Sequence, residues 1–64
     1  MKARDRMESA QRAIQYLKLA RSALRNVGAD QAADYVARAL KSAEGAERHA
    51  KRLYGEELAQ RATL

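Results

Sequence analysis

The amino-acid sequence predicts an all-α protein that folds as a two-helix antiparallel hairpin. The chain has 64 residues and no proline, and its glycines fall only at positions 28, 45 and 55. Apolar residues recur at spacings of three and four on both sides of Gly28, which is the periodicity of amphipathic helices. Two long segments without proline, joined by one glycine-containing turn, are typical of a helical hairpin.

The first helix is expected over about residues 3–26, because no breaking residue interrupts the apolar period there. Gly28 then suits the left-handed backbone conformation that commonly follows a helix end. Asp30 has a side chain that can cap the next helix by accepting from its free backbone N–H groups. A tight turn is therefore expected over residues 27–30.

The second helix is expected over about residues 31–54, with Gly55 as its stop signal. Helices of about 24 residues are about 36 Å long, and their equal lengths and short link favour antiparallel packing. Residues 55–64 form a predicted tail, which either adds a helical turn through Leu58, Ala59 and Ala62 or frays. The whole chain, residues 1–64, is predicted to be a single domain.

Small apolar residues dominate the seam that the helical period predicts. Small side chains let two helix axes approach more closely than the usual distance of about 8–10 Å. They also remove little apolar surface from water, so this seam stabilises a single hairpin weakly. The seam, within the hairpin or between two copies, is predicted to contain Ala10, Ala13, Leu17, Ala20, Leu24, Val36, Ala39, Ala43, Ala46, Ala50 and Leu53.

A partner chain is expected because the apolar faces are wider than one helix contact can cover. Met7 and Ile14 widen the face of the first helix, and Ala33, Leu40 and Tyr54 widen that of the second. A short chain without cysteine also commonly needs oligomerisation for stability. We therefore expect a homodimer that forms a four-helix bundle. The alternative is that the high helix propensity of alanine keeps a single hairpin folded.

The plan of the chain resembles the ROP-type regulators of plasmid copy number. The resemblance covers the alanine-containing pattern from Ala10 to Leu53, the turn at Ala29 and Asp30, and Gly55. Those regulators are helical hairpins of similar length that dimerise and bind paired RNA loops. The resemblance is one of architecture and implies a dimeric bundle. It implies no functional residue here, because no position matches that family's RNA-contacting residues.

The chain is basic, with 13 Lys and Arg against 8 Asp and Glu and a formal net charge of +5. Such a charge favours acidic partners, including nucleic acid or an acidic protein surface. Several cations have an acidic neighbour one helical turn earlier and are interpreted as ordinary surface pairs. These pairs are Glu8 with Arg12, Asp34 with Arg38, Glu44 with Arg48, and Glu47 with Lys51. Six of the remaining cations form a predicted partner-binding basic face, or else a solvated surface: Arg4, Lys18, Arg21, Arg25, Lys41 and Arg52.

Two charged residues, Arg21 and Glu47, interrupt the apolar faces of the predicted helices. A charge at such a position often sets helix register through a cross-helix ion pair. Arg6 and Arg21 are the candidate partners of Glu47. The alternative is that the Arg21 and Glu47 side chains extend along the helix surface to water.

No combination of residues predicts catalysis, a cofactor or a metal ion. His49 is the single histidine and follows Glu47 by two positions, which places the two on roughly opposite sides of a helix. The sequence has no glycine-rich phosphate loop and no nucleophile with a matching acid and base. It predicts a dimeric, non-catalytic interaction module in the cytoplasm, without a small-molecule substrate and without membrane binding. The alternative is a regulator that binds RNA or DNA through its basic helix faces.

Overall fold

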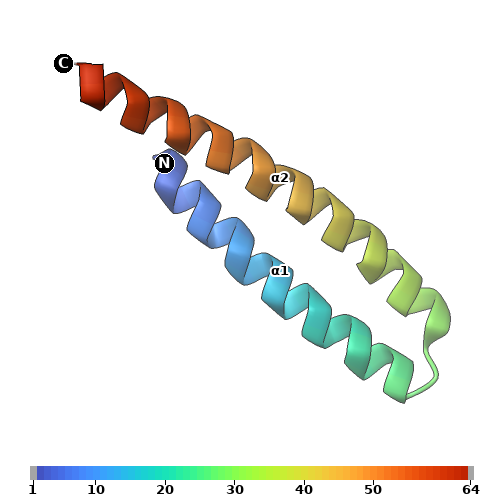
Figure 1. Ribbon diagram of the computed structural model, residues 1–64. Helices are drawn as coiled ribbons and strands as arrows, with labels where there is room; N and C mark the ends of the chain where they lie inside the picture. Colours follow the sequence, from blue (N-terminus) through green and yellow to red (C-terminus); the bar gives the residue numbers. More distant parts are fainter. Residues whose placement is uncertain (1, 64) are drawn as a thin grey trace.

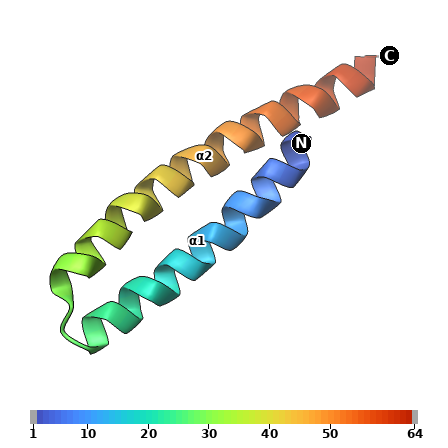
Figure 2. The same cartoon turned by 180° about the vertical axis from the view of Figure 1, so that it is seen from behind.

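The computed structural model describes residues 2–63, which form two α-helices and no β-strand. Helix α1 comprises Ala3–Asn26 and α2 comprises Asp30–Thr63. The helices run side by side in opposite directions, with the connecting turn at one end and both chain termini toward the other (Figures 1 and 2). The predicted all-α class is thus confirmed. Met1 and Leu64, the ends of the predicted domain, lie outside the described residues.

The turn between the helices is closed by backbone hydrogen bonds. The N–H of Gly28 donates to the carbonyl of Arg25 over 3.0 Å, and the N–H of Ala29 donates to the carbonyl of Leu24 over 2.8 Å. Gly28 has φ +77°, so the left-handed position predicted for this glycine is present. This pair of bonds is the Schellman arrangement that satisfies the last carbonyls of a helix. Asp30 begins α2 and lies in its first turn, where its carboxylate is favoured by the helix dipole.

Helix α2 continues past Gly55 to Thr63, where the sequence predicted a stop and a tail. Gly55 does not have a positive φ, in contrast to Gly28. A glycine inside a helix costs about 1 kcal/mol relative to alanine, which alone does not end a helix. The residues after Gly55 are mainly good helix formers. The last turns of α2 therefore extend beyond the start of α1, as Figure 1 shows.

The two helices pack through rows of residues that alternate spacings of four and three, the heptad pattern of a coiled coil. Every residue of these contact rows is buried or half-buried. The contact row of α1 consists of Ala3, Met7, Ala10, Ile14, Leu17, Arg21 and Leu24. The contact row of α2 consists of Ala33, Val36, Leu40, Ala43, Glu47, Ala50, Tyr54 and Glu57, and Ala29 in the turn continues it.

The core between the helices is thin. Among the described residues, the buried apolar side chains are Ala3, Ile14, Ala33, Leu40 and Ala50, and only Ile14 and Leu40 are larger than alanine. The molecule measures 55 × 14 × 14 Å, with a radius of gyration of 15.3 Å. A compact domain of this length has a radius of gyration of about 11 Å. The hairpin is therefore a rod with little interior.

The helices are rotated relative to the orientation in which all the predicted seam residues would face each other. Ile14 and Leu40 occupy the centre of the hairpin contact, although the sequence pattern placed them on its flanks. Burying these larger side chains removes more apolar area from water than burying alanine. The contact rows keep Ala10, Leu17, Leu24, Val36, Ala43 and Ala50 from the predicted seam. Leu53 is half-buried beside its row, whereas Ala13, Ala20, Ala39 and Ala46 are exposed.

Candidate functional site

Two sides of the hairpin differ in chemistry, and helix geometry decides which residues lie on each. A residue one position before or after a contact-row residue is rotated by about 100° around the helix axis, in opposite senses. Because α1 and α2 run in opposite directions, the residues that precede the contact rows fall on the same side of the hairpin in both helices. The residues that follow the contact rows fall together on the opposite side.

The side formed by the preceding residues carries no Lys, Arg, Asp or Glu over most of its length. Its side chains are mainly alanine and serine, and from them project Tyr16 and Tyr35, which are 67% and 61% exposed. We call this side the uncharged face. It consists of Ser9, Ala13, Tyr16, Ala20 and Ala23 of α1 and of Ala32, Tyr35, Ala39, Ser42, Ala46, His49 and Leu53 of α2. The charged residues Lys2, Arg6 and Glu56 also precede contact-row residues and lie on this side near the chain termini.

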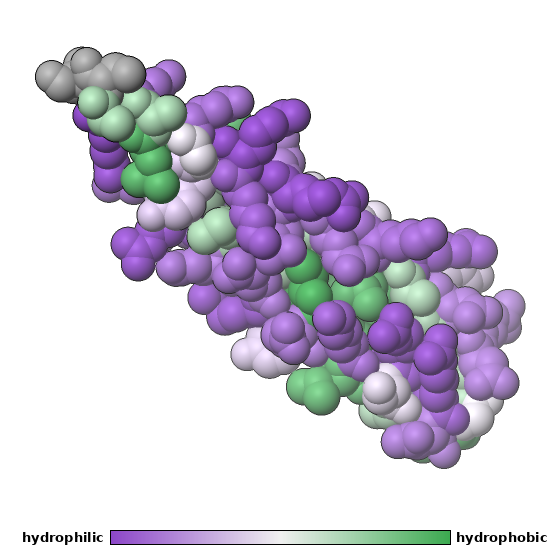
Figure 3. Space-filling view, in the orientation of Figure 1, coloured by the Kyte–Doolittle hydropathy of each residue, from purple (hydrophilic) through white to green (hydrophobic). Residues whose placement is uncertain are grey.

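The opposite side, which we call the polar side, carries charges of both signs, with cations in excess. Its residues on α1 are Arg4, Glu8, Gln11, Gln15, Lys18, Ser22 and Arg25. Its residues on α2 are Asp30, Asp34, Ala37, Lys41, Glu44, Arg48 and Lys51. In the view of Figure 3 hydrophilic surface predominates along the hairpin, and hydrophobic surface is confined to separate patches.

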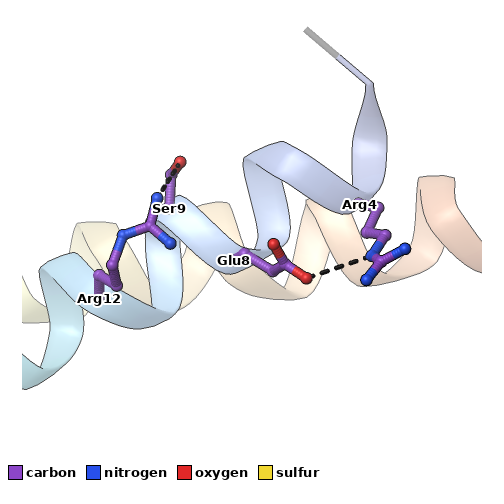
Figure 4. A network of polar contacts seen from close by, with 4 residues as sticks. All are labelled: Arg4, Glu8, Ser9 and Arg12. Atoms are coloured by element: carbon purple, nitrogen blue, oxygen red, sulfur yellow. Dashed lines mark hydrogen bonds and ion pairs between the residues drawn. The ribbon is translucent and has the colours of Figure 1, made fainter.

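Four residues of the predicted basic face lie on the polar side. Lys18, Arg25 and Lys41 are exposed, and none of the three forms an ion pair within residues 2–63. Arg4 is instead paired, because its Nε donates to Oε1 of Glu8 over 3.2 Å (Figure 4). The hydrogen bond and the negative charge of Glu8 raise the pKa of Arg4. Lys18, Arg25 and Lys41 are therefore the members of the predicted basic face that are open to an acidic ligand, and Arg48 on the same side is likewise exposed and outside the ion pairs of the described residues.

The other two residues of the predicted basic face lie elsewhere. Arg21 belongs to the contact row of α1 and is half-buried. Arg52 is exposed, and its guanidinium donates to Nδ1 of His49 over 3.0 Å, so its charged end lies beside the uncharged face. The rotation of the helices therefore separates six cations that the sequence pattern grouped together.

The surface pairs expected from the sequence are present only in part. Nζ of Lys51 lies 3.8 Å from Oε2 of Glu47, as the spacing predicts. The guanidinium of Arg38 lies over the ring of Tyr35, 5.6 Å from its centroid. Arg12 donates to the hydroxyl of Ser9 over 3.1 Å (Figure 4). These contacts anchor long side chains close to their own helices, and exposed contacts of this kind stabilise by only a few tenths of a kcal/mol.

The predicted cross-helix partners of Glu47, Arg6 and Arg21, form no ion pair with it among the described residues. Glu47 instead lines an open recess in the hairpin surface. The recess is lined by Glu8, Gln11, Arg12, Gln15 and Glu47. Its carboxylates and amides are accessible to water, as is the guanidinium of Arg12, so the recess is a wetted part of the surface.

The described residues contain no cluster of His, Cys, Asp and Glu arranged to hold a metal ion. Neither α1 nor α2, over the residues described, has an apolar stretch long enough to cross a membrane.

The chain matches no protein-family model, no curated protein and no solved structure. The uncharged face and the polar side, which differ in charge and exposed chemistry, are the candidate functional surfaces.

Proposed function

We propose that this protein is a small, non-catalytic interaction module that acts as a homodimer and regulates or adapts a macromolecular partner. The observation that carries the proposal is the separation of chemistry between the uncharged face and the polar side. Charged surface keeps a small protein soluble, whereas a large uncharged face favours association with another protein surface. Two opposite faces of different chemistry allow one to bind another hairpin while the other stays available to a partner.

The polar side suits an acidic partner. Lys18, Arg25 and Lys41 project from both helices on this side, and all three are exposed. Clustered charges of one sign speed encounter with an oppositely charged surface and contribute to specificity. The partner is therefore expected to present carboxylates or phosphates.

Charge reversal on the polar side is expected to abolish partner binding. The triple variant Lys18→Glu/Arg25→Glu/Lys41→Glu changes the net charge by −6, from +5 to −1. Repulsion then replaces attraction at the proposed contact. The measurement is affinity capture with the wild-type and variant chains as baits, and the expected result is a macromolecule that the wild type retains and the variant loses.

A matched control separates a specific surface from net charge alone. Lys2→Glu/Arg6→Glu/Arg61→Glu makes the same change in charge at exposed positions near the chain termini, outside the polar side and outside the twelve residues of the uncharged face. This control is expected to retain the partner. Equal loss of the partner with both triple variants would show that only the overall charge matters.

Nucleic-acid binding is the second candidate, favoured by the same three exposed cations. Neutralising phosphates with cations releases counterions, so the affinity falls with added salt in proportion to the number of contacts.

If Lys18, Arg25 and Lys41 each contact one phosphate of duplex nucleic acid, the logarithm of the binding constant falls by about 2.7 per tenfold increase in salt for each hairpin. A gel-shift titration with RNA and DNA measures this slope. The triple variant is expected not to bind. An absence of binding by the wild-type protein at low salt removes this candidate.

A further inference from the structure

We infer that the uncharged face is the binding site for a second copy of this chain, which packs the same face against it. This inference rests on the proposed function, which it deepens by assigning the dimer contact to one side of the hairpin. The hairpin contact already occupies the rows that contain Ile14 and Leu40. The contact between copies therefore uses the exposed residues of the uncharged face, which lie beside these contact rows. The resulting dimer is a four-helix bundle.

The chemistry of the face differs sharply from that of the remaining surface. Charged residues make up 33% of the chain, yet none of the positions on this side between Ser9 and Leu53 is charged. The charged positions of the same side, Lys2, Arg6 and Glu56, lie toward the chain termini. Three arginine side chains from neighbouring positions reach the edges of the face at Ser9, Tyr35 and His49. Protein interfaces are depleted in charge at their centres and enriched in tyrosine. The face thus combines an uncharged centre with two exposed tyrosines.

The shape of the face favours a second copy over an unrelated protein. Tyr16 and Tyr35 are exposed, and most other side chains of the face are the short ones of alanine and serine, so a partner can approach closely between the tyrosines. A two-fold interface needs a surface that is complementary to itself, because each copy contributes the same patch. One face that carries both exposed tyrosines and short side chains meets this requirement. Ala20 and Ala39 leave room for close approach of the two hairpins.

The accessible surface of the single hairpin is larger than that of a compact monomer of the same mass, by an area that one further protein contact could bury. Its accessible surface is 4942 Å² for a mass of 7.1 kDa, whereas a compact monomer of that mass exposes about 4100 Å². The excess of about 840 Å² is similar to the area of about 800 Å² that each partner buries in a standard protein–protein interface. One face-to-face contact with a second copy would bury an area of this size.

Site-specific alkylation tests which side is covered. The chain contains no cysteine, so Ala20→Cys places a single thiol on the uncharged face and Ser22→Cys places one on the polar side of the same helix. Both positions are exposed within one hairpin. The expected result is that a maleimide modifies the Ala20→Cys thiol about tenfold more slowly in concentrated protein than after dilution below the dimer dissociation constant. The Ser22→Cys thiol reacts at the same rate at both concentrations.

Sedimentation equilibrium provides an independent readout with a second pair of variants. The wild type is expected to have twice the mass of one chain, 7.1 kDa, at micromolar concentration. Ala39→Glu puts a carboxylate at the centre of the face and is expected to give a single-chain mass, whether or not that chain remains helical. Ser22→Glu adds the same charge to the polar side and is expected to leave the dimer mass unchanged.

Two results would overturn the inference. One is a wild-type protein that has the mass of a single chain and a helical circular dichroism spectrum at these concentrations. The other is a dimer in which the Ser22→Cys thiol is protected and the Ala20→Cys thiol is not.

Protection of Ala20→Cys in a monomer only after addition of another protein would assign the face to that protein. Loss of partner capture by the polar-side triple variant, with an unchanged dimer mass, tests the proposed function separately.

Discussion

Leu40→Ala is expected to lower the free energy of unfolding by about 2–5 kcal/mol, the range for removing a buried leucine from a packed core. Leu40 is 5% exposed and is one of two large side chains buried between the helices. Truncation removes apolar contact with α1 and leaves a cavity that a rod-shaped hairpin has few neighbouring side chains to fill. The measurement is urea unfolding followed by circular dichroism at one fixed protein concentration, because a dimer couples stability to concentration.

Leu19→Ala is the matched control, since it makes the same chemical change at an exposed position. Leu19 is 69% exposed and lies outside both the contact row of α1 and the uncharged face. Its truncation is expected to change the free energy of unfolding by less than about 0.5 kcal/mol, as is usual for surface substitutions. Similar losses in the two variants would contradict the helix rotation that buries Leu40.

Gly28→Ala and Gly55→Ala are expected to shift stability in opposite directions. Gly28 has φ +77°, and a Cβ added there meets no atom within 4 Å. The cost of alanine is therefore conformational, about 1–2 kcal/mol for a residue with a side chain in the left-handed region. Gly55 is helical and equally open, so alanine there stabilises α2 by about 0.5–1 kcal/mol.

Thermal unfolding of the two glycine variants beside the wild type measures this difference. A lower midpoint for Gly28→Ala and a higher midpoint for Gly55→Ala are the expected results. A fall in both midpoints would show that Gly55 serves as a helix stop, as the sequence pattern suggested. A rise in both would contradict the left-handed conformation of Gly28.

The helix bounds near the turn could be predicted from the sequence because the signals there are local. The apolar period begins at Ala3 and continues to Asn26, and α1 has these bounds. Gly28 fits the one backbone position in the turn that disfavours a side chain. Gly55 lies inside α2 and not at a helix stop. The predicted stop is wrong because glycine both ends helices and occurs inside them at modest cost. The identity of the residue alone does not distinguish these two uses.

The rotation of each helix, and with it the surfaces available for binding, could not be predicted from the sequence. Two overlapping heptad rows run along each helix, one rich in alanine and one that contains Ile14 or Leu40. Both rows satisfy the spacing of a helix contact. The predicted seam is the alanine-rich row, which shares about half of its positions with the row that packs. The predicted basic face joins Arg21 and Arg52 to cations on a different side. Only the packed hairpin distinguishes these positions.

The helical class, the position of the turn and the excess of positive charge follow from the sequence alone, because they depend on local backbone preference and composition. The tertiary structure decided which apolar row lies between α1 and α2, since helix packing depends on the total area buried against a partner. That choice places Ile14 and Leu40 inside and leaves Ala20 and Ala39 exposed. It also puts Lys18, Arg25 and Lys41 on the side opposite the uncharged face.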